Sequence, residues 1–355
     1  MSQKTILVAG ATGVNGYAVA HHFSNHPEYN VLTLSTEALY YNLLGSSHLQ
    51  VDLKDPEDAN VNTEQLRSIT HIFYAVLKPA DDPKQEADEN AVLFQNCIEW
   101  VRKHSDHLQH VTFLQGGKVY GAHLGIYPTP AFEGQTRHFP PNLYFRHEDY
   151  IANVCQDGQL TYTALRPDIL MGYSLYSAMN MGNLIGVYAS ICKETGMDFM
   201  FPGTPKAFEV LVNVTDADIV AEAVEWSFQD TTPKNTAYNI TNGDVFRWKQ
   251  AWKSIAEFYQ IPLGTAQPVS LQTYFDANEE RWKEMVTKYS LKDLKISEIT
   301  TGDFGDFIFA VEHDAIFDVN KARRNGFSPM TRKSTDGIVD HLKHLQAEKI
   351  IPTFT

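Results

Sequence analysis

Cysteine is scarce in this sequence. Only three of its 355 residues are cysteines, at positions 97, 155 and 192. An odd, widely spaced set argues against a disulfide scaffold and fits a reducing compartment. The 14 histidines, including the neighbouring pair His21 and His22, also lack a convincing metal-ligand spacing. The sequence therefore predicts no metal cofactor.

Long apolar runs and positive charge are scarce as well. No segment approaches the roughly 18 consecutive apolar residues that span a bilayer, and the apolar segment after Met1 is too short for a signal peptide. We therefore expect a cytoplasmic protein. The 29 Lys and Arg residues against 43 Asp and Glu give a formal charge of −14. An acidic surface repels phosphate backbones and anionic lipid, so we expect a small-molecule partner, with no nucleic acid and no membrane.

Short apolar segments alternate with helical segments through the first half of the chain. Several are apolar on both faces, as strands buried within a parallel sheet must be. The predicted strands are Thr5–Ala9, Asn30–Leu34, Gln50–Asp52, His71–Val76, Val111–Gln115 and Thr161–Arg166, and the clearest helices are Asn90–Lys103 and Asn142–Cys155. This alternation predicts an α/β fold with a Rossmann-type, doubly wound parallel sheet.

The character of the sequence changes after about residue 170. The next segment is rich in Tyr, Met, Asn and Gly. Later predicted elements are a strand at Thr236–Thr241 and helices at Phe246–Tyr259 and Ala277–Tyr289. We therefore expect a dinucleotide-binding domain over residues 1–170 and a smaller, mainly substrate-binding C-terminal lobe over 171–355, with about 205–245 returning to the sheet.

A glycine-rich loop follows the first predicted strand. In TILVAGATGVNG, Gly10 permits a tight turn, Gly13 lets a pyrophosphate approach the backbone, and Gly16 lets the helix pack near the strand. The helix N-terminus then offers free N–H groups to phosphate. A plain glycine turn is the alternative, but the strand–turn–helix context favours a dinucleotide. The predicted contacts in this loop are Gly10, Thr12, Gly13, Val14, Asn15 and Gly16.

The choice between NADPH and NADH depends on the end of the second predicted strand. This strand runs into Ser35, Thr36 and Glu37, without an acid at its tip to hold a ribose 2′-hydroxyl. No arginine that would accept a 2′-phosphate is cleanly present there either. The small hydroxyl residues Ser35 and Thr36 leave room for a 2′-phosphate, which favours NADPH over NADH.

The GxxGxxG spacing is similar to that of short-chain dehydrogenases/reductases. Most of these enzymes carry a Tyr-x-x-x-Lys pair on one helix, where a four-residue step puts both side chains on one face. No such pair fits here. Instead Tyr144 precedes Glu148 by four residues, and Lys118 follows the fifth predicted strand in the sequence GGKVYG.

These departures resemble the progesterone 5β-reductase/iridoid synthase-like family of atypical short-chain reductases. Similar segments are Thr70–Tyr74, the GGKVYG loop, Asn142–Asp149, Arg166–Gly172 with Tyr176, Ser177 and Asn180 after it, Asn239–Trp248 and the tail Asp306–Phe327. The sequence departs from the family at Phe145, which replaces a second tyrosine, and at Val119, where plant members have histidine. The arginines that select NADPH in the family are missing.

The resemblance implies 1,4-reduction of an enone or enal by a nicotinamide cofactor. Tyr144 would hydrogen-bond the carbonyl oxygen, on which negative charge develops. Lys118 would add positive charge nearby and favour phenolate character in Tyr144. The family position also places further residues at the cofactor. These are Asp52, Leu53, Ala75, Gln115, Gly116, Lys118, Tyr144, Pro167 and Ile169.

Two of these interpretations have structural alternatives. Asp52 resembles the superfamily residue that contacts the adenine, but it fits an ordinary turn acid equally well. A set of apolar residues predicts a substrate pocket, although such residues more often form plain core. The set is Tyr120, Phe145, Tyr176, Met179, Met181, Leu184 and Phe201.

Several functions remain open at this point. The runner-up enzymes are a 1,2-carbonyl reductase and a sugar-nucleotide epimerase, and epimerases normally keep the Tyr-x-x-x-Lys helix. The second class is a non-catalytic NADP-binding redox sensor, which would need neither Tyr144 nor Lys118. The expected partner is a small hydrophobic carbonyl compound, and a homodimer is plausible from base rates.

Overall fold

The computed structural model describes residues 3–59, 61–177 and 179–354. These residues form two compact units. Unit 1 consists of Met1–Pro167, Asp218–Ile240 and Asp318–Ser328, and unit 2 of Asp168–Ala217, Thr241–Phe317 and Pro329–Thr355. The part of the expected 205–245 segment that joins unit 1 is therefore Asp218–Ile240. A second return, Asp318–Ser328, has no counterpart among the sequence expectations.

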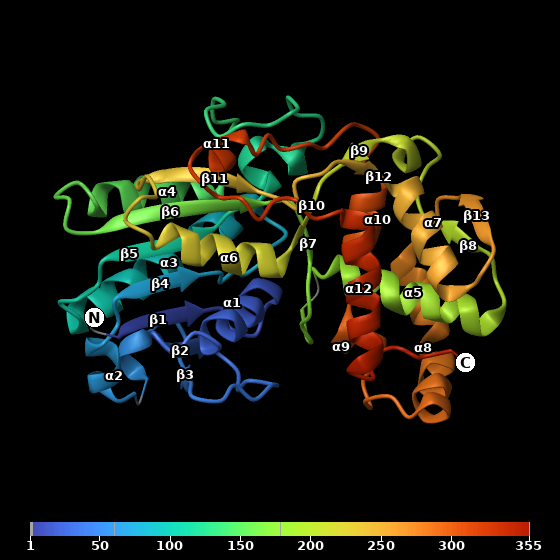
Figure 1. Ribbon diagram of the computed structural model, residues 1–355, viewed down its shortest axis with the longest axis horizontal. Helices are drawn as coiled ribbons and strands as arrows, with labels where there is room; N and C mark the ends of the chain where they lie inside the picture. Colours follow the sequence, from blue (N-terminus) through green and yellow to red (C-terminus); the bar gives the residue numbers. More distant parts are fainter. Residues whose placement is uncertain (1–2, 60, 178, 355) are drawn as a thin grey trace. The chain divides into compact units, whose positions relative to one another are not determined.

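Unit 1 is built on a seven-stranded parallel sheet with the order β11-β6-β5-β4-β1-β2-β3 (Figure 1). Its strands are β1 (Lys4–Ala9), β2 (Tyr29–Ser35), β3 (Ser47–Gln50), β4 (His71–Tyr74), β5 (His110–Leu114), β6 (Thr161–Pro167) and β11 (Thr236–Ile240). The first six strands follow the doubly wound order, in which ligands bind at the carboxyl edge where the order reverses. The predicted α/β Rossmann fold is confirmed.

Helices cover both faces of this sheet. They are α1 (Val14–Ser24), α2 (Thr63–Arg67), α3 (Pro83–His104), α4 (Leu143–Val154), α6 (Ala217–Ser227) and the short α11 (Asn320–Arg324). Successive strand residues point to opposite faces. On one face, Leu7, Ile72 and Val111 pack with residues of α2, α3 and α4. On the other, His71 packs on Phe228 just after α6, which in turn contacts Phe23 of α1.

Several predicted element boundaries are wrong; the helix expected over Ala277–Tyr289, for example, begins at Leu271. The third strand ends at Gln50 rather than covering Gln50–Asp52, because its partner β2 ends at Ser35, opposite Gln50. The helix expected from Asn90 begins seven residues earlier, at Pro83. The side chain of Asp82 caps it, accepting hydrogen bonds from the N–H groups of Lys84 and Gln85. Proline at the first position of a helix loses no hydrogen bond.

Unit 2 has short strands and a larger helical part. The strands are β7 (Ile169–Met171), β8 (Phe199–Phe201), β9 (Leu211–Val212), β10 (Val214–Asp216), β12 (Phe246–Arg247) and β13 (Leu263–Ala266). The helices are α5 (Met181–Thr195), α7 (Trp248–Tyr259), α8 (Leu271–Tyr289), α9 (Ile296–Ile299), α10 (Gly302–Phe309) and α12 (Ser334–Ala347). Its core includes Phe199, stacked on Trp252 with ring centroids 5.2 Å apart. No helix among the described residues is long and apolar enough to cross a membrane.

Candidate active site

The glycine loop between β1 and α1 shows why three glycines are needed. Gly10 has φ +86°, and a Cβ there would meet the Ala75 backbone at 2.9 Å. A Cβ on Gly16 would stand 2.0 Å from the Gly10 carbonyl oxygen. At Gly13 a Cβ would meet only the Gly10 oxygen, at 3.5 Å. Gly10 and Gly16 are therefore required by the protein's own packing, whereas the face of Gly13 is left open for close approach by a ligand.

The start of α1 offers hydrogen-bonding groups that the described chain leaves unused. Gly13 occupies the N-cap without a side-chain cap, so the first-turn N–H groups are available to an anion. The buried side-chain oxygen of Asn15 has no hydrogen-bond partner among the described residues. An uncapped helix end and an open glycine face fit a dinucleotide pyrophosphate.

We expect Gly16→Ala and Gly13→Ala to separate packing from ligand approach. Gly16→Ala forces a methyl group into backbone and should reduce the free energy of unfolding by roughly 1–3 kcal/mol. Gly13→Ala should lose much less stability and still weaken dinucleotide binding. Urea unfolding and calorimetric titration with dinucleotide measure the two effects. Equal destabilisation by the two variants would contradict this assignment.

The segment after β2 is held by its neighbours. Ser35 donates its hydroxyl hydrogen bond to the Glu37 carbonyl at 2.6 Å, and Gln50 donates to the Thr36 carbonyl at 3.0 Å. The Thr36 side chain is exposed. Asp52 accepts a hydrogen bond from the Lys54 N–H at 2.9 Å, so it stabilises the turn after β3. Contacts of Ser35, Thr36 and Asp52 with a nucleotide stay predictions.

Two further cofactor positions also contribute to the packing of unit 1. Leu53 is buried in the core, and its carbonyl accepts a hydrogen bond from Asn96 at 2.8 Å. The Ala75 N–H donates to the Ala9 carbonyl at 2.9 Å, continuing the alignment of β4 with β1. The Ala75 backbone thus reaches the same turn as Gly10, which is consistent with its predicted position beside the dinucleotide.

Tyr144 stands in the first turn of α4. Asn142 caps this helix, because its side-chain oxygen accepts a hydrogen bond from the Tyr144 N–H at 2.9 Å. The Tyr144 hydroxyl lies 3.5 Å from the position that a Cβ on Gly116 would take. The side chain is only partly exposed, and no residue in the described ranges hydrogen-bonds its hydroxyl. A largely buried phenol is thus left with a free donor.

Lys118 lies in a short 3-10 turn, η2 (Gly117–Tyr120), after β5. Its ammonium is 2.8 Å from each carboxylate oxygen of Glu86. Its carbonyl accepts hydrogen bonds from the side chains of Asn142 at 2.9 Å and His138 at 2.7 Å. Asn142 therefore fixes both the turn that carries Lys118 and the helix that carries Tyr144.

Glu86 changes the expected electrostatics of this pair. It lies in the first turn of α3 and is only 7% exposed. Burial, and after it the charge of Glu86, raise the pKa of Tyr144 above its ordinary value. Glu86 pairs with the Lys118 ammonium and offsets its charge, so the expectation that Lys118 favours a phenolate in Tyr144 stays a prediction. Tyr144 is held as a neutral phenol, the form that donates a hydrogen bond.

The buried side chain of Arg166 is connected to Tyr144 through hydrogen bonds. Arg166, in β6, donates hydrogen bonds to Gln115 (2.7 Å), the Tyr120 hydroxyl (3.1 Å) and Glu148 (2.6 Å). Gln115 donates in turn to the carbonyl of Tyr144 at 3.3 Å. Burial would raise the pKa of Glu148, but the charge of Arg166 and the hydrogen bonds it receives hold that pKa below its ordinary value. The carboxylate is therefore ionised and paired.

The network continues from Tyr120 into the edge strand β11. The Tyr120 hydroxyl donates to the side-chain oxygen of Asn239 at 2.5 Å, and burial raises the Tyr120 pKa to about 12. The Asn239 amide donates to the carbonyls of Ala131 and Asp318 at 2.9 and 3.0 Å. In the segment Asn239–Trp248, which resembles a family motif, Asn239 therefore fixes the loops that contain Ala131 and Asp318.

The predicted substrate-pocket residues fall into two groups. In unit 1, Tyr120 and Phe145 are buried, and the Arg137 guanidinium lies 4.8 Å from the Phe145 ring. In unit 2, three of the predicted residues have no exposed surface and form core, which corrects their assignment as pocket lining: Met181, Leu184 and Phe201.

The other predicted positions in unit 2 are accessible. Tyr176 and Met179 are 58% and 42% exposed. Tyr176 has φ +59°, a strained conformation for a bulky residue that is typical of functional positions. Two predicted cofactor positions are less accessible. Ile169, in β7, is buried, with 9% of its surface exposed. The carbonyl of Pro167, in unit 1, lies 3.8 Å from a Cβ built on Gly116. Ligand contacts at these positions stay predictions.

Sequence reasoning missed Glu86 as a site residue. A usable signal exists in α3, where Glu86 and Asn90 lie at helical spacing on the same buried face as Phe94 and Cys97. Two polar residues on an otherwise apolar stripe are unusual unless they have partners. Asn90 holds the chain before α3, because it donates to the carbonyl of Lys78 at 2.7 Å and accepts from its N–H at 2.9 Å.

Curated proteins similar to this chain include two plant enzymes. The chain is 31% identical over 320 residues to 3-oxo-Delta(4,5)-steroid 5-beta-reductase of Arabidopsis thaliana, covering 86% of this chain and 80% of the relative. It is 31% identical over 316 residues to (S)-8-oxocitronellyl enol synthase of Catharanthus roseus, with the same two coverages. The names of these relatives agree with the family expected from the motifs around Lys118 and Tyr144.

Solved structures with the same fold include UDP-glucose 4-epimerase of Thermotoga maritima. It aligns with a TM-score of 0.66 at 16% identity, over 97% of this chain and 99% of that one. A likeness at this identity supports the fold alone. The PRISE-like Rossmann-fold domain matches residues 23–352 of the sequence. With the two plant relatives, this match shows that the chain belongs to the PRISE-like Rossmann-fold family.

Proposed function

We propose that this protein is a nicotinamide-dependent oxidoreductase that reduces the C=C bond of an enone or enal. The observation that carries the proposal is the hydroxyl of Tyr144, a largely buried donor beside Gly116 that no described residue hydrogen-bonds. The relatives support the reaction class, since one is named as a 3-oxo-Delta(4,5)-steroid 5-beta-reductase and another as an 8-oxocitronellyl enol synthase.

Tyr144 would act on the substrate oxygen. A reduced nicotinamide dinucleotide, when bound, would supply the hydride to the β-carbon, and the α-carbon would take its proton from solvent. The Tyr144 hydroxyl donates a hydrogen bond to the substrate carbonyl, and this bond strengthens as negative charge develops on the enolate oxygen. A fixed donor in a partly buried site stabilises that charge more than it stabilises the ground state. The raised pKa of Tyr144 keeps the proton on the phenol at neutral pH.

Glu86 and Lys118 act as a neutral pair beside this donor. The two hydrogen bonds of 2.8 Å fix the Lys118 ammonium, which has a third donor left for a ribose hydroxyl or the substrate. Because Glu86 balances its charge, Lys118 has little tendency to favour loss of the Tyr144 proton. We propose Tyr144 as the catalytic residue and Lys118 as the group that binds and orients.

A pH profile tests the role of Glu86. The charge of Glu86 raises the pKa of Tyr144, so Glu86→Gln should lower that pKa by removing the negative charge and leaving the Lys118 ammonium unbalanced. If the neutral phenol is the active form, the alkaline loss of kcat should move to lower pH. Steady-state rates up to the highest pH at which the protein stays folded test whether the Glu86→Gln variant loses kcat at a pH where the unmodified enzyme keeps it. An unchanged alkaline limb would contradict the electrostatic role of Glu86.

We propose NADPH as the cofactor, with NADH as the alternative. The support is the sequence after β2, where Thr36 is exposed and small and no acid stands at the tip of the strand. We expect a higher kcat/KM with NADPH when both cofactors are compared in oxidation at 340 nm. A preference for NADH would assign the nearby Glu37 to the ribose hydroxyl instead.

Product analysis separates the competing functions. Incubation with a panel of small and steroidal enones should give the saturated carbonyl compound. An allylic alcohol would indicate 1,2-reduction at the same site. Dinucleotide binding without turnover would favour the redox sensor, and interconversion of UDP-sugars would favour the epimerase. Light scattering in solution tests the proposed homodimer.

A further inference from the structure

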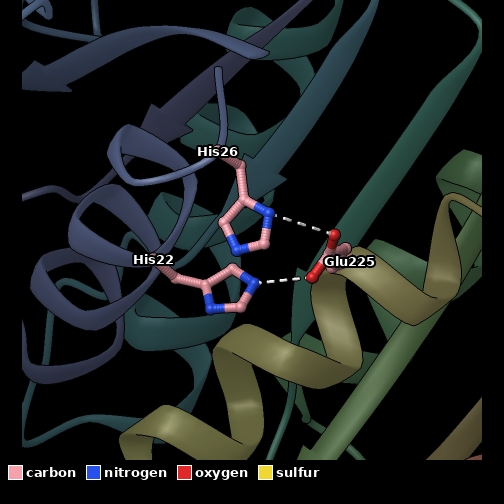
Figure 2. A group of neighbouring side chains, drawn as sticks. All are labelled: His22, His26 and Glu225. Carbon is pink, nitrogen blue, oxygen red and sulfur yellow. Dashed lines mark hydrogen bonds and ion pairs between the residues drawn. The ribbon is translucent and has the colours of Figure 1, made fainter. Parts of the chain in front are cut away.

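Two histidines and a glutamate meet on unit 1 outside the candidate active site. His22 lies in the last turn of α1, His26 follows that helix by two residues, and Glu225 lies in α6 (Figure 2). One ligand atom from each side chain lies within 4.8 Å of the other two. From its geometry we propose that this cluster binds a divalent transition metal ion of the Zn²⁺ type.

The distances fit a tetrahedral metal after a small adjustment. His22 Nε2 is 2.7 Å from one carboxylate oxygen of Glu225, and His26 Nδ1 is 3.7 Å from the other. Zn²⁺ bonds of about 2.0–2.1 Å place tetrahedral ligands about 3.3 Å apart. The two separations lie on either side of that value. All three ligand atoms lie within 4.8 Å of one another, so rotations of the side chains would bring them to the tetrahedral spacing.

The chemistry of the ligands selects the kind of ion. Two imidazoles with one carboxylate suit Zn²⁺ and its neighbours in the transition series, whereas Mg²⁺ and Ca²⁺ prefer oxygen alone. Glu28 Oε1 lies 3.6 Å from His26 Nδ1, so a fourth ligand is at hand, and water is the alternative. The side chains of His22, His26 and Glu225 are 20%, 35% and 29% exposed, which leaves an ion a path from solvent.

An ion at this cluster would cross-link elements far apart in the sequence. His22 and Glu225 are separated by 203 positions, and the metal would tie the end of α1 to α6. His22 stands about 13 Å along the helix from Gly13, at 1.5 Å per residue. The site is thus separate from the glycine loop, and we expect a stabilising role. The expectation of no metal considered only spacing along the chain, which cannot reveal Glu225.

The ordinary alternative is a set of ion pairs without metal. Figure 2 shows both imidazoles directed at Glu225. The two rings are 4.7 Å apart. Ion pairs of Glu225 with His22 and of Glu28 with His26 would account for the cluster without a metal, and metal titration separates the two explanations.

Metal titration of the intact protein tests the proposal. After treatment with chelator, calorimetry should show one Zn²⁺ bound per chain, with no comparable binding of Mg²⁺, and melting temperature should rise with Zn²⁺. His22→Ala and Glu225→Gln should weaken binding at least about tenfold, since even an outer-shell change costs 10–100-fold. The glutamine variant can keep the hydrogen bond to His22, which guards against misfolding.

His107→Ala is the matched control, because His107 is exposed and lies outside the cluster. It should bind Zn²⁺ as the unmodified protein does. Co²⁺ adds a second readout, since a four-coordinate ion absorbs visibly and a hydrated one hardly does. The proposal is overturned if no Zn²⁺ binds, or if His22→Ala and Glu225→Gln bind it as tightly as His107→Ala.

Discussion

Tyr144→Phe is expected to lower kcat about 10²–10³-fold while dinucleotide affinity stays unchanged. The substitution removes the one donor proposed to face the developing enolate, and losing a single such donor costs about 2.7–4 kcal/mol of transition-state stabilisation. Because no described residue hydrogen-bonds this hydroxyl, its loss should leave the free energy of unfolding nearly unchanged. Single-turnover rates, calorimetric titration and urea unfolding measure the three quantities.

Tyr150→Phe is the matched control for this experiment. Tyr150 lies on the same helix, and its hydroxyl bonds Glu99 instead of standing free. It should keep the rate of the unmodified enzyme. A Tyr144→Phe variant with full activity would remove the phenol from the mechanism. A variant that loses stability instead would show that Tyr144 is a packing residue.

Arg166→Met is expected to cost about 3–5 kcal/mol of the free energy of unfolding. Arg166 is buried, with a side chain 7% exposed, and it serves Gln115, Tyr120 and Glu148 at once. Removing one member of a buried ion pair leaves the other charge poorly compensated, which has a cost of this size. Urea unfolding followed by circular dichroism measures it.

Arg137→Met makes the comparison specific. Arg137 also pairs with Glu148, at 2.9 Å, but its side chain is 43% exposed. Pairs at the surface contribute about 0–1 kcal/mol, so this variant should be nearly as stable as the unmodified protein. Similar losses in the two variants would mean that the ion pair itself, and not the burial of Arg166, sets the energy.

The sequence alone determined the fold and the family. Alternating apolar segments fixed the strands of the sheet, because strands covered on both faces must be apolar throughout. The spacing of Gly10, Gly13 and Gly16 placed the turn, since the backbone at Gly10 and Gly16 leaves no room for a Cβ. The motifs around Lys118 and Tyr144 identified the family, and the matches confirm it.

Only the tertiary structure decided the electrostatics around Tyr144. Glu86 comes from a helix far earlier in the sequence, and its pairing with Lys118 depends on how α3 packs beside the η2 turn. The ionisation of Tyr144 is set by burial and by charges in space, neither of which appears in local sequence. The meeting of His22 with Glu225 has the same origin, because contacts between distant segments arise only when the chain folds.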